Sequence, residues 1–434
     1  MVGRLGRGAV MMVGLATVLG ACSGQPSEEG SGGSAPADAV GTPAGGTTDE
    51  PSGGSGDSSD PGAAPSGSAG EGSGGSGDAT GDPSSSGDDT HGEAPSPSKA
   101  PSDLARKVPA GEKPPQFVVI SWDGAGETPR EKGVSRFRTA ADESDAHMTF
   151  FLSGPFLATG EEVAETYRPP MHPKGMQHIR PRTAQMVRET TRELAAAIEA
   201  GHELGTHYNG HFCGPQGGAD WSVAQWHQEM NEWYRFVERW EGKTPLKGGT
   251  ALPKGIARKV QGGRTPCLEG PENAQKAAAE DGWTYDSSTV GAVTWPEKAN
   301  GVWNFPIPSV QVHGSDAMGR RSVLAMDYNW LSAFNTWAPE VSKAERGRVM
   351  EKTYEHELEQ ALEGNRAPLV LGNHLAAWDD GTYLDAMERF TREQCPREEV
   401  HCVSFAELVE FLDAQDPQRL AAWRTVPPGG RGRW

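Results

Sequence analysis

The stretch GHELGTHYNGH, residues 201–211, joins the end of one predicted helix to a predicted strand and a pair of histidines. Residues 182–201 carry apolar side chains at helical spacing and stop at Gly201, which is typical of an amphipathic helix. The segment HELGTH then has the pattern of a short strand with its exit loop. In folds that alternate helices and strands, functional side chains collect at the carboxyl ends of the strands. His207 and His211 are therefore the first candidate functional residues.

The same alternation runs through the rest of the second part of the chain. QFVVISW (116–122) and AHMTFFLSG (146–154) are short apolar runs, as expected for buried parallel strands. Further strands are expected at GVWNFPIPSVQV (301–312), whose prolines indicate a sheet edge, at APLVLGNH (367–374) and at VHCVSF (400–405). Helices are expected at 222–242, 271–282, 342–364, 381–394 and 405–414. This order predicts an α/β fold with a mainly parallel sheet and helices outside, either a barrel or doubly wound.

Residues 1–22 have the composition of an export signal. Two arginines precede an apolar run of about a dozen residues, which is too short to span a bilayer as a mature helix. The run ends in LGAC, which resembles the lipobox of bacterial lipoproteins, in which the cysteine is lipidated. This resemblance implies a lipid anchor at Cys22 and a protein exported to the outer face of the bacterial membrane.

Residues 23–114 are rich in Gly, Ser, Pro and acidic residues and contain almost no large apolar side chains. A segment of this composition cannot bury enough apolar surface to offset chain entropy, so we expect a disordered tether. It carries 15 acidic and 4 basic residues, and the whole chain has a formal net charge of −19. More than half of the acidity thus belongs to the tether, and it argues against nucleic acid as a partner. Residues 115–434 are long enough for one large α/β domain, and nothing in them indicates a protein partner.

Four cysteines lie in this predicted domain, and an even number in an exported domain suggests disulfides. Cys395 and Cys402 are close in sequence and would close a short loop. Cys213 and Cys267 would then pair by elimination.

Three of the predicted strand ends carry side chains that suit a divalent metal. They supply Asp123, the pair His207 and His211, and His374. One carboxylate and two imidazoles would suit Zn²⁺ or a similar ion, with positions left for water and substrate. Two histidines four residues apart are a weak signal by themselves. His202 follows the glycine that ends a helix, and we expect it to pack or cap rather than to bind a ligand.

Taken in order, these segments resemble the NodB-homology family of polysaccharide deacetylases, which remove N-acetyl or O-acetyl groups from chitin, peptidoglycan or hemicellulose. The family motifs are TFDDG, GHEIGNHTxxH, RPPxG with a following YDSS, an aromatic–proline stretch and a strand that ends in histidine. Their counterparts are SWDGAG (121–126), GHELGTHYNGH (201–211), GGRTPCLEGPENAQKAAAEDGWTYDSS (262–288), VWNFPIPS (302–309) and PLVLGNH (368–374). Five motifs in the same order are far more specific than any one of them.

The resemblance implies a distorted (β/α) barrel with fewer than eight strands and a metal-bound water that attacks an acetamide carbonyl. A metal lowers the pKa of such a water and polarises the carbonyl. By their matching positions, His207 and His211 would bind the metal, and Arg264 would orient the catalytic carboxylate. His374 would protonate the leaving group, and the backbone N–H of Cys267 would contact the oxyanion. Trp303 and Pro308 would line the acetyl pocket.

The first motif departs from the family pattern. The family has two adjacent aspartates, a general base and then a metal ligand, whereas here Asp123 is followed by Gly124. Aligning the motifs residue by residue makes Asp123 the base and leaves a metal ligand missing, whereas sliding by one makes it the ligand and leaves the base missing. Glu127, Asp379 and Asp380 are other candidate carboxylates, although acids in solvated loops are the expected alternative.

The fifth motif also differs, because Gly372 stands where the family has leucine, so the acyl pocket is expected to be wider or differently built. The sequence therefore predicts a metal-dependent deacetylase of the cell envelope that acts on an acetylated glycan. Two alternatives stay open. One is a surface lipoprotein that keeps the barrel and binds glycan without turning it over, and the other is a hydrolase of a different C–N bond.

Overall fold

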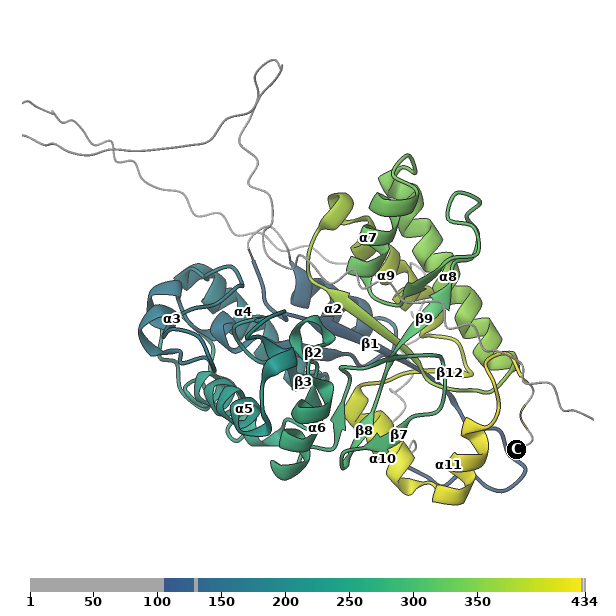
Figure 1. Ribbon diagram of the computed structural model, residues 1–434, viewed down its shortest axis with the longest axis horizontal. Helices are drawn as coiled ribbons and strands as arrows, with labels where there is room; N and C mark the ends of the chain where they lie inside the picture. The colour runs from purple at the N-terminus through teal and green to yellow at the C-terminus, as the bar shows by residue number, and fades with distance from the viewer. Residues whose placement is uncertain (1–104, 129–131, 431, 433–434) are drawn as a thin grey trace, which may run out of the picture. The chain divides into compact units, whose positions relative to one another are not determined.

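The computed structural model describes residues 105–128, 132–430 and 432 (Figure 1). The predicted signal, Cys22 and most of the predicted tether lie outside these residues. Residues 105–114, which the sequence places in the tether, are described and contact the C-terminal helices: the N–H of Val108 donates to Gln415 Oε1 at 2.9 Å. Val108 itself is buried. No helix within the described ranges is long and apolar enough to cross a membrane.

The centre of the domain is a mainly parallel sheet. Its strands follow the order β11-β1-β2-β3-β4-β5-β8-β7, and β12 pairs with the first residues of β1. From β11 to β8 all neighbours are parallel, and β7 runs antiparallel at the edge. The bounds are β1 Gln116–Asp123, β2 Thr149–Leu152, β3 Glu203–Thr206, β4 Gly262–Gly263, β5 Tyr285–Asp286, β7 Glu297–Ala299, β8 Val302–Asn304, β11 Leu369–His374 and β12 Val400–Cys402. This confirms the predicted α/β class and distorted barrel, whereas the sheet has nine strands among the described residues rather than the fewer than eight that the resemblance implied.

Helices connect and cover these strands (Figure 1). They are α2 Gly133–Asp142, α3 Gly160–Thr166, α4 Ala184–Glu199, α5 Val223–Glu238, α6 Pro271–Glu280, α7 Asp327–Trp337, α8 Lys343–Glu363, α9 Thr382–Gln394, α10 Phe405–Ala414 and α11 Pro417–Arg424. Their starts follow local chemistry: the side chains of Ser222 and Ser404 cap α5 and α10, each in a capping box. The apolar faces meet the sheet, where all eight residues of β1 are buried. A rigid, fully buried strand therefore carries Asp123.

The aromatic–proline stretch forms two strands rather than the single strand expected over 301–312. The sheet strand β8 ends at Asn304, and β9 (Ile307–Gln311) belongs to a second sheet of order β10-β9-β6. Its other members are β6 (Val290–Gly291) and β10 (Ser322–Leu324). Pro306 lies at the break, and proline cannot donate to a ladder, which explains the interruption.

Both predicted disulfides are present. Cys213 pairs with Cys267, and Cys395 pairs with Cys402. The first bond joins the loop after β3 to the loop after β4, so it ties together two segments that follow neighbouring strand ends. The second closes the short loop between α9 and β12.

Candidate functional site

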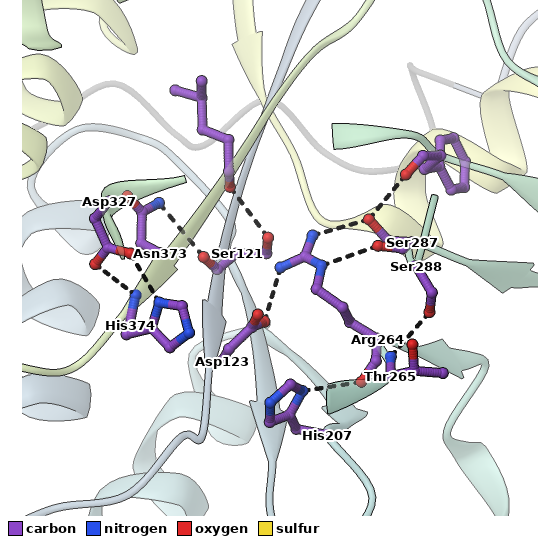
Figure 2. A network of polar contacts seen from close by, with 12 residues as sticks. Ser121, Asp123, His207, Arg264, Thr265, Ser287, Ser288, Asp327, Asn373 and His374 are labelled. Atoms are coloured by element: carbon purple, nitrogen blue, oxygen red, sulfur yellow. Dashed lines mark hydrogen bonds and ion pairs between the residues drawn. The ribbon is translucent and has the colours of Figure 1, made fainter. Parts of the chain in front are cut away.

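The site lies where the parallel strands end. Asp123 is the last residue of β1 and His374 the last of β11, and the two are register partners across the sheet. His207 follows β3 directly, and Arg264 follows β4. Because these strands run in the same direction, their ends bring together residues that are far apart in the sequence (Figure 2).

Arg264 is the central cation of the site. Its Nη1 donates to Asp123 Oδ1 at 2.7 Å, Nη2 donates to Ser287 Oγ at 2.8 Å, and Nε donates to the carbonyl of Ser287 at 3.0 Å (Figure 2). The side chains of Arg264 and Asp123 are 0% and 2% exposed, so water does not compete for this ion pair. The guanidinium is thus fixed on three sides and holds Asp123 in one orientation.

The residues after β5 complete this support, a role that the sequence did not reveal. Ser287 holds the guanidinium, and Ser288 Oγ accepts from the N–H of Thr265 at 2.8 Å. Ser288 in turn donates to Asp286 Oδ2 at 2.6 Å. The YDSS segment thereby fixes both the side chain of Arg264 and the backbone that follows it.

Asp123 remains ionised in this surrounding. Burial by itself would raise the pKa of its carboxyl, but the guanidinium of Arg264, with a further contribution from His374, holds that pKa below its ordinary value. The carboxylate is therefore available to accept a proton at neutral pH.

His374 has a carboxylate partner that the sequence analysis missed. Its Nδ1 lies 2.8 Å from Asp327 Oδ1, and its backbone N–H donates to Asp327 Oδ2 at 2.8 Å (Figure 2). Burial lowers the pKa of His374, but the carboxylates of Asp327 and Asp123 together raise it, and the net shift is upward. Asp327 begins α7, which no sequence pattern had indicated. The pair favours an imidazolium whose other nitrogen is available to donate.

His207 is fixed by the backbone of the neighbouring loop. Its Nδ1 lies 2.9 Å from the carbonyl oxygen of Arg264, so Nδ1 carries the hydrogen and Nε2 keeps its lone pair. Burial lowers the pKa of His207 despite the nearby Asp123. The ring of His211 is centred 5.3 Å away, and burial together with His207 lowers its pKa to about 3. Both imidazoles are therefore neutral.

A buried carboxylate on α5 holds the loop between these histidines. Glu229 Oε1 accepts from the N–H groups of Asn209 and Gly210 at 3.1 and 3.3 Å, and from the hydroxyl of Tyr167 at 2.8 Å. His211 has φ +58°, which is uncommon for a residue other than glycine. Glu229 satisfies the backbone donors of this tight loop, although it lies 22 residues after His207 in an ordinary helical sequence.

The same positions test whether a metal fits. Among the described residues, two groups of three offer ligand atoms that lie within 4.8 Å of one another, namely His211 with Cys213 and Cys267, and Glu351 with Glu355 and Glu393. Neither contains Asp123 or His207. Because Asp123 is bound to Arg264 and the next residue is Gly124, the residues present do not fit a centre with three ligands, Asp123, His207 and His211. Of these three residues, only His207 and His211 remain available to bind an ion.

The other candidate acids are engaged elsewhere. Glu127 is buried rather than solvated, and its Oε1 accepts from the hydroxyl of Ser135 on α2 at 2.8 Å. Asp379 pairs with Arg346 at 2.9 Å, and Asp380 pairs with Lys343 at 2.9 Å. These contacts give none of the three a role beside Asp123.

The surroundings of Gly372 bear on the acyl pocket that the resemblance implies. A side chain at Gly372 would meet Met326 Cε at 2.8 Å and Ile307 Cδ1 at 3.2 Å, so neighbouring side chains fill the space that the glycine leaves. Met326 forms a bridge with Gly372, and its side chain is buried. Met326 and Ile307 therefore occupy the space beside Gly372, a contact that the sequence analysis missed, and the acyl pocket itself stays a prediction.

The two predicted pocket residues lie differently. Trp303 is on β8, and its Nε1 donates to Asp413 Oδ1 on α10 at 2.9 Å. Pro308 is buried on β9, where its carbonyl accepts from Ala325 at 2.8 Å, next to Met326. Cys267 lies in the short 3₁₀ turn Pro266–Leu268 with φ +56°. Its backbone role as an oxyanion donor stays a prediction.

His202 has the structural surroundings that we expected. It is buried, and its Nδ1 accepts from the N–H of Met148 at 3.2 Å. Burial lowers its pKa to about 4, so the ring is neutral.

No family model matches the chain, and no curated protein matches it. Among solved structures, it is similar to a protein from Mycobacterium smegmatis assigned to the polysaccharide deacetylases, with 15% identity, a TM-score of 0.43, and coverage of 71% of this chain and 93% of that one. It is also similar to a family 4 carbohydrate esterase from Streptomyces lividans solved with acetate, with 12% identity, a TM-score of 0.32, and coverage of 66% and 91%.

A third similar structure is a pseudoenzyme of carbohydrate esterase family 4 from Bacillus anthracis, with 11% identity, a TM-score of 0.34, and coverage of 69% of this chain and 66% of that one. At these identities and TM-scores the likenesses say nothing about the activity of this chain. The solved structures to which the chain is similar include polysaccharide deacetylases and family 4 carbohydrate esterases.

Proposed function

We propose that this protein removes acetyl groups from a polysaccharide by hydrolysis, with Asp123 as general base and His374 as general acid. The observation that carries the proposal is the pair of register partners at the ends of β1 and β11. One is a carboxylate whose pKa is lowered by Arg264 against the effect of burial, and the other is an imidazole whose pKa is raised by Asp327 against the effect of burial. Titratable neighbours with pKa values shifted in these ways suit an acid and a base.

In the reaction, Asp123 takes a proton from a water molecule as its oxygen attacks the acetyl carbonyl carbon. The negative charge that develops on the carbonyl oxygen is stabilised by backbone N–H donors, for which that of Cys267 is the candidate. His374 then donates its proton to the departing nitrogen or oxygen as the bond to the acyl carbon breaks. The products are acetate and a free amine or hydroxyl on the glycan.

Arg264 and Asp327 act through these two groups and are positioning residues. Arg264 keeps the lone pairs of Asp123 directed into the site, since each of its three nitrogens donates a hydrogen bond. Asp327 holds the His374 ring through Nδ1, which leaves Nε2 as the atom that delivers the proton.

No step is assigned to a metal, because Asp123 is committed to Arg264. His207 and His211 could still bind a divalent ion such as Zn²⁺ as two neutral imidazoles, and a bound ion would polarise the substrate. The alignment that makes Asp123 the base is supported by its contact with Arg264. The position of the missing ligand is then Gly124.

The missing ligand is also the observation that favours a second candidate function. A protein that retains the site geometry but lacks one metal ligand could bind glycan without turning it over. Two buried pairs argue against such a binding protein, namely Asp123 with Arg264 and His374 with Asp327. Glycan binding alone does not need an acid and a base at neighbouring strand ends.

Acetate release separates the candidates. The purified protein is incubated with N-acetylated chitooligosaccharides, peptidoglycan and acetylated xylan, with and without added Zn²⁺, and acetate is measured enzymatically. Release from any of these supports hydrolysis, whereas glycan binding without acetate under every divalent ion supports the binder. Breakdown of a cyclic imide in place of acetylated glycan would identify the third class. Asp380→Asn is the matched control, since Asp380 is exposed and its carboxylate pairs with Lys343 at the surface.

We also propose that the domain works outside the cell, held to the membrane through a lipid at Cys22. The support is the sequence of residues 1–22 and the two disulfides, which form in oxidising compartments. Metabolic labelling with a fatty acid, lost in Cys22→Ser, tests the anchor.

A further inference from the structure

A second cluster of potential metal ligands, here called the rim cluster, lies in the loops that follow β3 and β4. His211, Cys213 and Cys267 each offer one ligand atom within 4.8 Å of the others, and all three residues are partly exposed. In this structure the two cysteines form a disulfide, so their sulfurs are not thiolates. His211 Nδ1 lies 3.7 Å from Cys213 Sγ. The cluster thus combines a disulfide, which a reductant can open, with an imidazole nitrogen that lies beside it.

The spacing fits a tetrahedral site in the reduced state. With Zn–S bonds of about 2.3 Å and Zn–N bonds of about 2.0 Å, a sulfur and a nitrogen on one ion lie about 3.5 Å apart. The observed separation of His211 Nδ1 and Cys213 Sγ is close to this. The Cα atoms of Cys213 and Cys267 are 6.1 Å apart, so rotation about each Cα–Cβ bond would let both sulfurs reach a shared ion without moving the backbone.

The two loops stay together without the disulfide. The N–H of Gly214 donates to both carboxylate oxygens of Glu269, at 3.1 and 2.8 Å, which links the segments that follow Cys213 and Cys267. His207 Nδ1 contacts the carbonyl of Arg264 as a further link between the same two loops. Reduction would therefore free the thiols while the loops keep them near His211.

We propose that the reduced protein binds a soft divalent ion such as Zn²⁺ through the thiolates of Cys213 and Cys267 and the imidazole of His211. A dithiol supplies the two electrons: it becomes a disulfide as the Cys213–Cys267 bond breaks, and its two protons pass to the two cysteines. The ion then displaces both thiol protons, because metals bind the thiolate. Thiolate and imidazole together are the ligands that zinc prefers, and the fourth position is left for water.

The other disulfide does not offer such a site. Cys395 and Cys402 are 4% and 5% exposed, and no third ligand joins them among the described residues. The difference makes this pair the matched control, since its removal leaves the rim cluster intact.

The consequence for catalysis rests on the proposed function. His211 bound to the rim ion would no longer be available beside His207 to hold an ion that polarises the substrate, so reduction with metal uptake is expected to lower any acetate release that depends on such an ion. The metal site itself does not depend on that activity, and it is tested without measuring activity.

The experiment uses Co²⁺, whose bonds to thiolates give an intense charge-transfer absorption. The full-length protein is reduced with dithiothreitol, desalted without oxygen and titrated with Co²⁺, and the same is done with the oxidised protein. We expect one Co²⁺ per chain and the charge-transfer band in the reduced protein only, with competition by Zn²⁺. The double variant Cys395→Ser/Cys402→Ser keeps the band, and Cys213→Ser/Cys267→Ser loses it. His211→Ala weakens Co²⁺ binding at least about tenfold.

Three results would overturn the proposal. One is the absence of the band in the reduced protein, and another is a band that survives in Cys213→Ser/Cys267→Ser. The third is loss of the near-ultraviolet circular dichroism of the native fold on reduction, because the site would then not exist. If the cobalt titration gives the expected result but the oxidised protein releases no acetate, the proposed function is contradicted and the rim cluster is still supported as a metal site.

Discussion

Asp123 and His374 are paired in register at the carboxyl ends of β1 and β11, and each is held by an oppositely charged partner from another strand or helix. Arg264 reaches Asp123 from the end of β4, and Asp327 reaches His374 from the start of α7. The ends of β1, β4 and β11 and the start of α7 therefore together determine the protonation states of Asp123 and His374.

Asp123→Asn removes the proposed base and keeps the shape of the side chain. We expect acetate release to fall at least about 100-fold, the usual contribution of a general base. Arg264 would remain buried without its counter-charge, so the free energy of unfolding should also fall, by about 3–5 kcal/mol. Activity is therefore measured at a temperature where chemical denaturation shows the variant to be folded. Activity like that of Asp380→Asn in the folded variant would remove Asp123 from the mechanism.

Asp327→Asn should change the pH dependence of the reaction. In the native protein, Asp327 raises the pKa of His374 against the effect of burial, so the imidazolium survives to higher pH than in an ordinary histidine. Activity that needs this acid is present below that pKa and is lost as pH rises through it. The variant lowers the pKa, and the alkaline limb of the kcat/KM profile moves to lower pH while the acidic limb stays. An alkaline limb that does not move would show that His374 is not the acid.

Gly124→Asp should restore a third metal ligand. Gly124 has φ +64°, which aspartate tolerates better than most residues, and a Cβ there would meet only Phe156 Cε2, at an ordinary 3.7 Å. With His207 and His211 it would complete a carboxylate–imidazole set, and Zn²⁺ affinity should rise at least about tenfold. Competition with a chromophoric chelator measures this in the oxidised protein. Gly124→Asn imposes the same backbone cost without the charge, so equal affinities in the two variants would argue against a site at this position.

The two disulfides should differ in their contribution to stability. Cys213–Cys267 spans 54 residues and Cys395–Cys402 spans 7. The loop-entropy relation predicts that replacing both cysteines by serine costs about 4 kcal/mol for the first pair and about 2 kcal/mol for the second. Denaturation of the two double variants by guanidinium checks the order. A larger loss from Cys395→Ser/Cys402→Ser would mean that native-state contacts outweigh chain entropy here.

Much of the fold could be predicted from local pattern. The continuous apolar run of β1 and the helical spacing of α4, α5 and α8 are properties of neighbouring residues, and the structure has these elements within a few residues of their predicted bounds. The break between β8 and β9 and the helix α7 were missed. Pro306 interrupts a run that otherwise has strand character, and α7 is rich in aromatic residues that pack against other elements, so neither is evident from periodicity.

The candidate site divides in a similar way. Asp123, His207, Arg264 and His374 were found because each follows a strand and matches a motif. Asp327, Glu229 and Met326 were not, because their partners lie at sequence separations of 47, 20 and 46 residues and no local spacing records such contacts. The motif places Trp303 in the pocket, which stays a prediction, and its contact with Asp413, 110 residues later, could not be read from the sequence.

The sequence alone determined the alternating order of strands and helices, the residues at the strand ends and the pairing of the cysteines, because these depend on composition, periodicity and count. Only the tertiary structure decided which carboxylate contacts which cationic side chain. Asp123 and Arg264 are 141 residues apart in the chain and 2.7 Å apart in space. Their contact arises from the parallel order of β1 and β4 in the sheet, and it commits the single aspartate to the arginine, which leaves two histidines without a third ligand.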